Sequence, residues 1–193
     1  MLDFDERYMV RKSYYLTGTG AMGQTLDAGD AVKVGSDSVK ILCTGHGLPV
    51  GAVIFIAGTT NYNGYHTITA KGDDDFTFVA TYEAETIASD DTLSHRLLPG
   101  DLARLIEIRL HLSVASAQAD DLTIALDSGE DAVYDCIFIT QDINGLADFP
   151  YVWGEANSPK FNNSLDALIF AWANKDSRTW GLEVIYDVMQ ATD

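Results

Sequence analysis

The chain has 193 residues, of which 47% are hydrophobic and 10% aromatic, so it can bury a substantial core and is not a disordered chain. Its 12 basic and 29 acidic residues give a formal net charge of -17, which repels a phosphate backbone and argues against nucleic acid as a partner. The N-terminus lacks the pattern of a signal peptide, and no apolar run approaches the roughly 18 residues of a membrane span. We therefore expect synthesis in a cytoplasm and no contact with a membrane.

The two cysteines, Cys43 and Cys136, each lie in a short apolar run. A thiol in such a run usually behaves as a small buried hydrophobic group. We therefore expect two buried, free cysteines and no disulfide.

The first half of the chain is rich in β-forming residues. Residues 6–18 (ERYMVRKSYYLTG) are typical of a strand, and residues 21–34 read as a loop that leads into a short strand. Between about residues 36 and 92, β-branched runs alternate with glycine turns. Four or five short strands are predicted there, which would form a small barrel or meander, and the clearest runs are 38–45, 52–58, 65–70 and 76–82.

A glycine-rich stretch within this segment contains two histidines, His46 and His66. Together with Cys43 they would supply three zinc ligands, but no second Cys or His pair lies at the spacing of a zinc site. The alternative is that the glycines permit tight turns and that His46 closes the turn before Gly47. The pattern favours this architectural role.

Alternation with a period of two dominates the second half of the chain. In residues 104–113, one face of the predicted strand carries Ile106, Ile108, Leu110 and Leu112. Turn residues separate the β-forming runs, and no amphipathic helix lies between them, so the pattern predicts an antiparallel sandwich. Further strands are predicted at 120–128, 134–142, 166–176 and 179–189.

Residues 46–78 (HGLPVGAVIFIAGTTNYNGYHTITAKGDDDFTF) resemble a small β-module that recurs in bacteriophage tail, fibre and capsid-associated proteins. The shared pattern is His-Gly-Leu, a glycine before a strand, Tyr-Asn-Gly, and a final strand with phenylalanine. The resemblance covers about residues 38–87, which is under a third of the chain. It implies that this segment is a unit of its own.

The rest of the chain is similar to a β-sandwich protein encoded in phage structural gene regions. The segments that carry this resemblance are TGTGAMGQTL, IEIRLHLS, DDLTIALDSGEDAVYD, TQDINGLADFPYVW and FAWANKDSRTWGLEVIY. The first two segments lie close together in that family, whereas about 80 residues separate Leu26 from Ile106 here. The resemblance implies an all-β fold, a jelly-roll-like sandwich with a small β-barrel inserted into one loop, divided as 1–35 and 93–193 around 36–92.

Acidic turns offer oxygen atoms that calcium prefers, and the best candidates are Asp127, Glu130 and Asp131. Their spacing does not match a helical calcium loop. The alternative is a solvated turn, because aspartate suits turns between strands. The sequence favours the turn, so we expect no bound metal.

No catalytic motif is present in the sequence. A Gly-x-Ser-x-Gly elbow and a phosphate-binding Gly-Lys loop are both missing, and nothing pairs Glu107, Glu155 or Glu183 across a cleft. We therefore expect no enzymatic activity and no cofactor.

Three residues near a proline and a glycine are candidates for ligand or interface contacts: Tyr151, Trp153 and Asn157. Such aromatic residues suit either a sugar ring or a subunit interface. By contrast, alternation assigns Trp172 and Trp180 to the core.

The sequence therefore predicts a non-enzymatic virion protein, either a capsid decoration or cement protein or a head- or tail-associated accessory protein. By the same resemblance, its partners are the major capsid or tail protein, and a homotrimer is favoured. The alternative is a receptor- or glycan-binding module of a tail or head fibre. That alternative predicts exposed aromatic residues in a concave surface, whereas decoration predicts a flat apolar patch.

Overall fold

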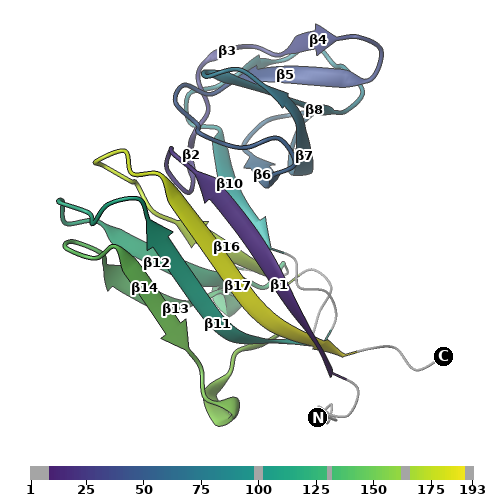
Figure 1. Ribbon diagram of the computed structural model, residues 1–193. Coiled ribbons are helices and arrows are strands. Elements are labelled where there is room, and N and C mark those ends of the chain that lie inside the picture. The colour runs from purple at the N-terminus through teal and green to yellow at the C-terminus, as the bar shows by residue number, and fades with distance from the viewer. Residues whose placement is uncertain (1–8, 98–101, 130–131, 162–165, 190–193) are drawn as a thin grey trace.

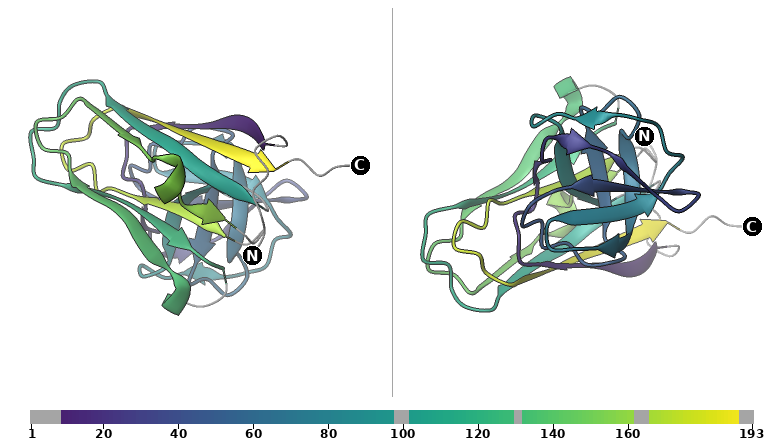
Figure 2. Two further views of the ribbon diagram at one scale, coloured as in Figure 1. Left: turned by 90° about the horizontal axis from the view of Figure 1, so that it is seen from below. Right: turned by 90° about the horizontal axis from the view of Figure 1, so that it is seen from above.

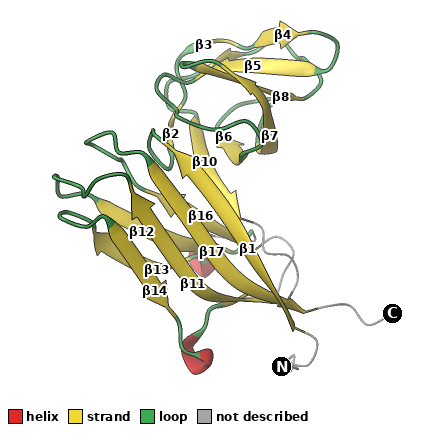
Figure 3. Cartoon of the chain, viewed as in Figure 1, coloured by secondary structure: helices red, strands yellow, loops and turns green. Residues whose placement is uncertain are grey.

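The computed structural model describes residues 9–97, 102–129, 132–161 and 166–189. Figure 3 shows that strands dominate the described chain, and no helix in it is long and apolar enough to cross a membrane. The predicted all-β class is confirmed. The strands and 3-10 helices are β1 (Met9–Gly18), β2 (Gln24–Thr25), β3 (Gly29–Asp30), β4 (Val32–Val34), β5 (Ser38–Leu42), β6 (Val53–Ala57), β7 (Gly64–Lys71), β8 (Asp75–Val79), β9 (Thr86–Ile87), β10 (Thr92–Leu97), β11 (Ala103–Leu112), β12 (Asp121–Asp127), η2 (Ala132–Tyr134), β13 (Cys136–Asp142), β14 (Asp148–Val152), η3 (Glu155–Asn157), β15 (Lys160–Phe161), β16 (Ala167–Ala171) and β17 (Trp180–Met189).

Eight of the described strands form a β-sandwich of two antiparallel sheets (Figure 1). The first sheet has the order β1-β17-β11-β14, and the second contains the order β10-β16-β12-β13. Along the chain, every connection between these eight strands crosses to the other sheet, except the β12–β13 hairpin. This arrangement of two Greek keys is a jelly roll, so the predicted sandwich is confirmed.

The larger of two hydrophobic clusters fills the space between these sheets. Alternate residues of β16 and β17 point into it, including Phe170 and Leu182, as the alternation predicted. The prediction for β11 was wrong at one position, because a bulge between Leu105 and Glu107 shifts the register. Leu105 is therefore buried, and Ile106 is only partly buried.

A second hydrophobic cluster fills a smaller unit built from β3 to β9. Its strands β6, β7 and β8 are consecutive antiparallel neighbours, and β5 and β4 continue the sheet beyond β8. Figures 1 and 2 show this sheet curled at one end of the sandwich. The second sheet of the sandwich continues into the smaller unit, because β10 pairs with both β16 and β6.

The borders of the two cores differ from the borders predicted after residues 35 and 92. Met22 belongs to the larger cluster, whereas Leu26 already belongs to the smaller one. On the return path, β10 contributes Leu93 to the smaller cluster and Leu97 to the larger one. A single alternating strand serves both cores, so the sequence pattern contains no break at this border. The division into host and insert itself stays a prediction.

The two units meet at glycines. A Cβ atom added to Gly20 would lie 2.5 Å from the carbonyl oxygens of Gly45 and His46. At Gly47, whose φ is +60°, an added Cβ would lie 2.2 Å from the Gly20 nitrogen. Backbones can approach this closely only because glycine lacks a Cβ.

His46 is buried beside this contact, and both of its ring nitrogens are hydrogen-bonded. Nδ1 accepts from the Leu48 amide at 3.0 Å. Nε2 therefore carries the proton, and it donates to the Asp75 carbonyl at 3.0 Å. The geometry gives His46 the turn-closing role that the glycine pattern favoured.

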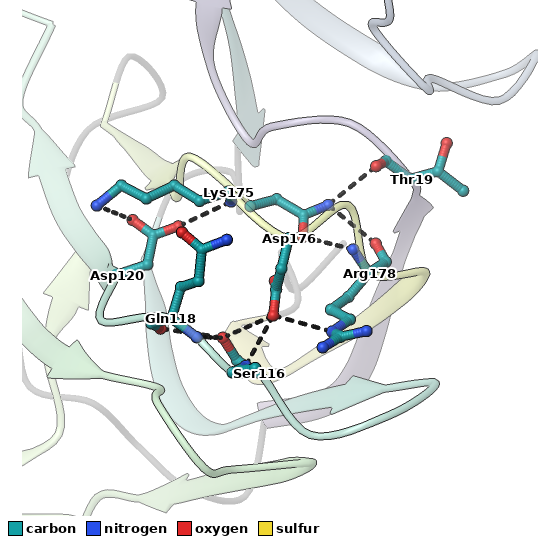
Figure 4. Close-up of polar contacts among 9 residues, drawn as sticks. Thr19, Ser116, Gln118, Asp120, Lys175, Asp176 and Arg178 are labelled. Carbon is teal, nitrogen blue, oxygen red and sulfur yellow. Dashed lines mark hydrogen bonds and ion pairs between the residues drawn. The ribbon is translucent and has the colours of Figure 1, made fainter.

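On the sandwich side, the β16–β17 loop and the first residue of β17 hold the segment of Thr19 and Gly20, and Figure 4 shows the contact of the loop with Thr19. Trp180 Nε1 donates to the Gly20 carbonyl at 2.8 Å, and Asn174 Nδ2 donates to the carbonyls of Thr19 and Gly20 at 2.9 and 3.2 Å. Asp176 links this loop to the β11–β12 loop by accepting from a backbone amide at 2.7 Å. The smaller unit therefore packs on a segment that has little freedom to move.

The two free cysteines differ in exposure. Cys43 is buried in the smaller core, whereas Cys136 is exposed at the start of β13. The prediction of a buried thiol was wrong for Cys136, because β13 is an edge strand and its first residues lie outside the core.

We expect a thiol reagent to modify one cysteine in the folded protein and two in the unfolded protein. Burial raises the pKa of Cys43 to about 11, so little of its reactive thiolate form exists at neutral pH. Titration with a chromogenic disulfide reagent measures the number of accessible thiols. A Cys136→Ser variant should show no rapid reaction, and rapid reaction of that variant would contradict the prediction.

Candidate functional site

The outer face of the first sheet carries two adjacent rows of side chains that cross all four strands. In strand order β1, β17, β11 and β14, the first row consists of Tyr15, Glu183, Arg109 and Pro150. The second row consists of Thr17, Gly181, His111 and Asp148. Side chains alternate along each strand, so these residues lie on the face opposite the core.

A hollow of about 490 Å³ lies over these two rows. Gly181 forms its floor. A Cβ added to Gly181 would have no other atom within 4 Å, so the space above this residue is open. Tyr15 and Pro150 line it from the two edge strands. The hollow has the size of a small-molecule site and combines apolar surface with a few polar groups.

Arg109 is held between two carboxylates beside the hollow. Its Nε and Nη2 atoms donate to Glu107 at 2.7 and 2.9 Å, and Nη1 donates to Glu183 at 3.1 Å. The Tyr15 hydroxyl donates to the second Glu183 oxygen at 2.7 Å. Hydrogen bonding and the charge of Glu107 raise the pKa of Arg109, so the guanidinium stays charged. The bonds orient Tyr15 and Arg109 before any ligand binds.

A second hollow of about 200 Å³ adjoins the first across the free edge of β1. Tyr15 and Thr17 line both hollows, and the second one extends to residues 49–52 of the smaller unit. In the first hollow, His111 Nδ1 contacts the Asp148 carboxylate. The two hollows together form a surface that involves both units of the protein.

Asp187 lies at the other end of the same sheet face and binds two arginines. Arg11 Nε donates to it at 2.9 Å and Arg104 Nε at 3.1 Å. Burial raises the pKa of Asp187, but the hydrogen bonds and charges of the two arginines outweigh burial and leave the pKa below its ordinary value. This cluster is partly buried and joins β1, β17 and β11, so its role is structural.

A second exposed feature, which we call the apolar edge, is a set of exposed apolar side chains from both sheets at one end of the sandwich, in η2, at the start of β13 and at the end of β14. These antiparallel strands are the edge strands of the two sheets, and a short turn joins them, so the start of one and the end of the other lie at the same end of the sandwich. Between 39% and 76% of each side chain in the apolar edge is exposed: Val133, Tyr134, Ile137, Tyr151 and Val152.

The three predicted contact residues have different environments. The sequence placed Tyr151 in a loop, but it lies in β14, because an edge strand tolerates the preceding Pro150. Its ring lies 4.6 Å from the ring of Trp153, which is partly buried against the larger core. Asn157 is exposed in η3. Of the three, Tyr151 is the one that belongs to the apolar edge.

The candidate metal ligands are occupied by other contacts where they are described. Asp127 pairs with Arg96 and accepts from the Gly129 amide at 3.0 Å. Glu130 and Asp131 lie outside the described residues, so the calcium hypothesis stays a prediction. His66 Nε2 donates to a backbone carbonyl at 2.8 Å. Within the described ranges, no group of three His, Cys, Asp or Glu side chains is placed to hold a metal ion.

Sequence reasoning missed Tyr15 and Gly181, and it did not pair Glu107 with Glu183. The available signal was weak: a glycine inside a strand often marks a close approach of another group. The shared contact of both glutamates with Arg109 depends on the strand order, which the sequence does not contain.

His95 is a further residue that the sequence did not single out. It is fully buried in β10, and neither ring nitrogen has a hydrogen-bond partner in the structure. Its ring packs edge-on against Trp180 at 5.6 Å between centroids. Burial lowers the pKa of His95 to about 4, so the ring is neutral at pH 7.

The fold and these surfaces define an all-β jelly-roll protein with a hollow on one outer sheet face and an apolar edge. No protein family matches the chain, and no curated protein matches it. Among solved structures, the chain is similar to VP17, a capsid protein of bacteriophage P23-77, at 12% sequence identity and a TM-score of 0.19, over 93% of this chain and 82% of that one. At this TM-score the likeness carries no argument about fold or function.

Proposed function

We propose that the protein is a non-enzymatic structural protein of a bacteriophage virion. In this role it is a decoration, cement or accessory protein on the head or tail, and it binds the major capsid or tail protein through its sandwich. The resemblance of the sequence segments to phage structural proteins supports the setting. The apolar edge carries the proposal, because exposed apolar side chains gathered at one end of a sandwich are of the kind that a neighbouring protein covers.

The apolar edge combines two properties of a binding surface. Val133, Ile137 and Val152 are each at least 65% exposed, so an isolated chain leaves this apolar area in water. The same end of the sandwich also contains the outermost strands β13 and β14 of the two sheets, and the free edge of such a strand pairs readily with another chain. A capsid or tail protein that packs here would cover the exposed apolar area and pair with the free strand edges.

The contacts of the carboxylates support the absence of catalysis in this proposal. Glu107 and Glu183 both bind the Arg109 guanidinium, so neither is a free acid or base beside the hollow. A glycoside hydrolase needs two carboxylates that face each other across the substrate.

We expect the double substitution Ile137→Lys and Val152→Lys to weaken binding to virus particles by about tenfold or more, because two buried apolar contacts become charged. The measurement is co-sedimentation of the purified protein with particles of the encoding phage that lack it. Val79→Lys is the matched control, since Val79 is 65% exposed, like Val152, but lies in the smaller unit. Equal binding of all variants, or no binding of the wild type, would contradict the proposal.

We further propose that the protein is a homotrimer, by analogy with decoration and fibre proteins. Light scattering after size-exclusion chromatography should then give a mass of three times 21.0 kDa. A monomer mass over the whole concentration range would refute the trimer and leave the binding experiment unaffected.

A further inference from the structure

We propose that the hollow above Gly181 binds a neutral oligosaccharide. This goes beyond a structural role on the particle and does not depend on it. Three properties of the hollow carry the inference: its shape, its flat apolar surfaces and the arrangement of its hydrogen-bonding groups.

The shape is set by the missing side chain at Gly181. In the row Thr17, Gly181, His111, Asp148, every other member has a side chain, so the row is interrupted at β17 and the surface sinks there. The resulting volume of about 490 Å³ accommodates a small organic ligand. The adjoining hollow of about 200 Å³ continues past Tyr15 toward the smaller unit, which suits an extended chain rather than a single compact molecule.

The flat surface comes mainly from Tyr15, which is 66% exposed. Its hydroxyl is bound to Glu183 at 2.7 Å, so the ring has a fixed direction while its faces stay open. Pro150 provides a second apolar ring on the opposite strand of the hollow. Sugar rings have apolar C–H faces that pack on such surfaces, and an amphipathic aromatic side chain provides large contact area at small entropic cost.

The polar groups of the hollow suit hydroxyl groups. Glu183 and Asp148 offer acceptor oxygens, and Arg109, Thr17 and His111 offer donors, so both halves of a hydroxyl find partners. Glu107 and Glu183 already neutralise Arg109, which leaves no free positive charge for a phosphate or a sialic acid. Anionic ligands are therefore disfavoured, and a neutral polyol is favoured.

A glycan array tests the proposal with the protein as it exists. The wild type, labelled at the exposed Cys136 on the other sheet, should bind neutral oligosaccharides, and longer chains should bind better than disaccharides because they reach the second hollow. The array should also contain acidic glycans and arginine-rich peptides. Binding only to the acidic glycans or only to the peptides would overturn the proposal, and so would no binding at all.

Two variants locate the binding on the protein. An added Cβ at Gly181 meets no atom within 4 Å, so Gly181→Leu should fold normally, fill the floor of the hollow and lose about tenfold or more in affinity. Tyr15→Ala should lose a similar factor because the flat surface disappears. Gly154→Leu is the matched control, since an added Cβ at Gly154 also meets nothing and the residue does not line the hollow. Unchanged binding by Gly181→Leu, with the fold intact, would refute the site.

Discussion

The wild-type protein is expected to lose about 2 kcal/mol more of its free energy of unfolding between pH 6.5 and pH 5 than a variant in which phenylalanine replaces His95. His95 is fully buried and its two ring nitrogens have no hydrogen-bond partner in the structure. A buried imidazole without a partner is tolerated in its neutral form only, because nothing there compensates the loss of hydration of a charge. His95 lies where the second sheet of the sandwich continues into the smaller unit, since it pairs with both Phe170 and Ile54.

The direction of the pH effect follows from the lowered pKa. Burial, with a smaller electrostatic contribution from His46, brings the pKa of folded His95 to about 4, below the ordinary value of 6.5. Between these two values the unfolded chain binds a proton that the folded chain does not bind. Stability is therefore unaffected by His95 above pH 6.5, falls as the pH drops below 6.5, and levels off below about pH 4. Each pH unit within this window contributes about 1.4 kcal/mol.

Urea unfolding at pH 7 and pH 5 measures this effect above the isoelectric point of about 4.3. The wild type should lose about 2 kcal/mol more than His95→Phe over this interval. His95→Leu is the second variant, because it avoids the extra volume of phenylalanine in a close-packed site. His66, whose pKa is also lowered by burial, titrates in all three proteins and cancels in the comparison. Parallel losses in the wild type and both variants would show that folded His95 binds a proton as readily as the unfolded chain does, so that its pKa is not lowered.

The sequence predicted the strands of this protein better than its surfaces. Alternation located the strands from β11 to β13, as well as β16 and β17, because one face of each packs on a core while the other faces water. Alternation failed at Leu105, where a bulge inserts one residue, and at Tyr151, where a proline hid an edge strand. Both errors concern positions where the backbone departs from the ideal period or pairing.

The candidate site was beyond the reach of sequence patterns for a different reason. Its rows join residues that lie up to 168 positions apart, as in the contact of Tyr15 with Glu183. Such rows exist only after β17 has inserted between β1 and β11, and one sequence does not specify that order. Gly181 carried only the weak signal of a glycine inside a strand, because its effect on the surface comes from the side chains of the neighbouring strands.

Substitution of Gly47 by alanine is expected to destabilise the protein by at least about 3 kcal/mol. Two effects add at this position. The positive φ of +60° disfavours any residue with a Cβ, and that Cβ would lie 2.2 Å from the Gly20 nitrogen and 2.7 Å from Thr19 Oγ1. The backbone of Gly20 cannot move away easily, since Trp180 and Asn174 hold its carbonyl oxygen.

Gly45→Ala and Gly20→Ala separate the two effects. Gly45 has a positive φ of +64° but open space around its Cβ position, so alanine there should cost only about 1 kcal/mol of backbone strain. Gly20→Ala introduces the collision with Gly45 and His46 without a positive φ, and it should cost about 2 kcal/mol or more. Urea unfolding measures each cost. If Gly47→Ala were no worse than Gly45→Ala, close backbone packing would not join the two units.

The collision should also loosen the smaller unit before the sandwich. The strand β10, which contributes to both cores, would remain paired with β6. The turn at Gly45 to Gly47, however, would lose its contact with the sandwich. Hydrogen exchange in Gly47→Ala should therefore accelerate most in β5 to β8, whose amides lie in the smaller core, and least in β16 and β17. Uniform acceleration in both units would mean that they unfold as one, and that the glycine contact stabilises the whole chain rather than the position of the smaller unit.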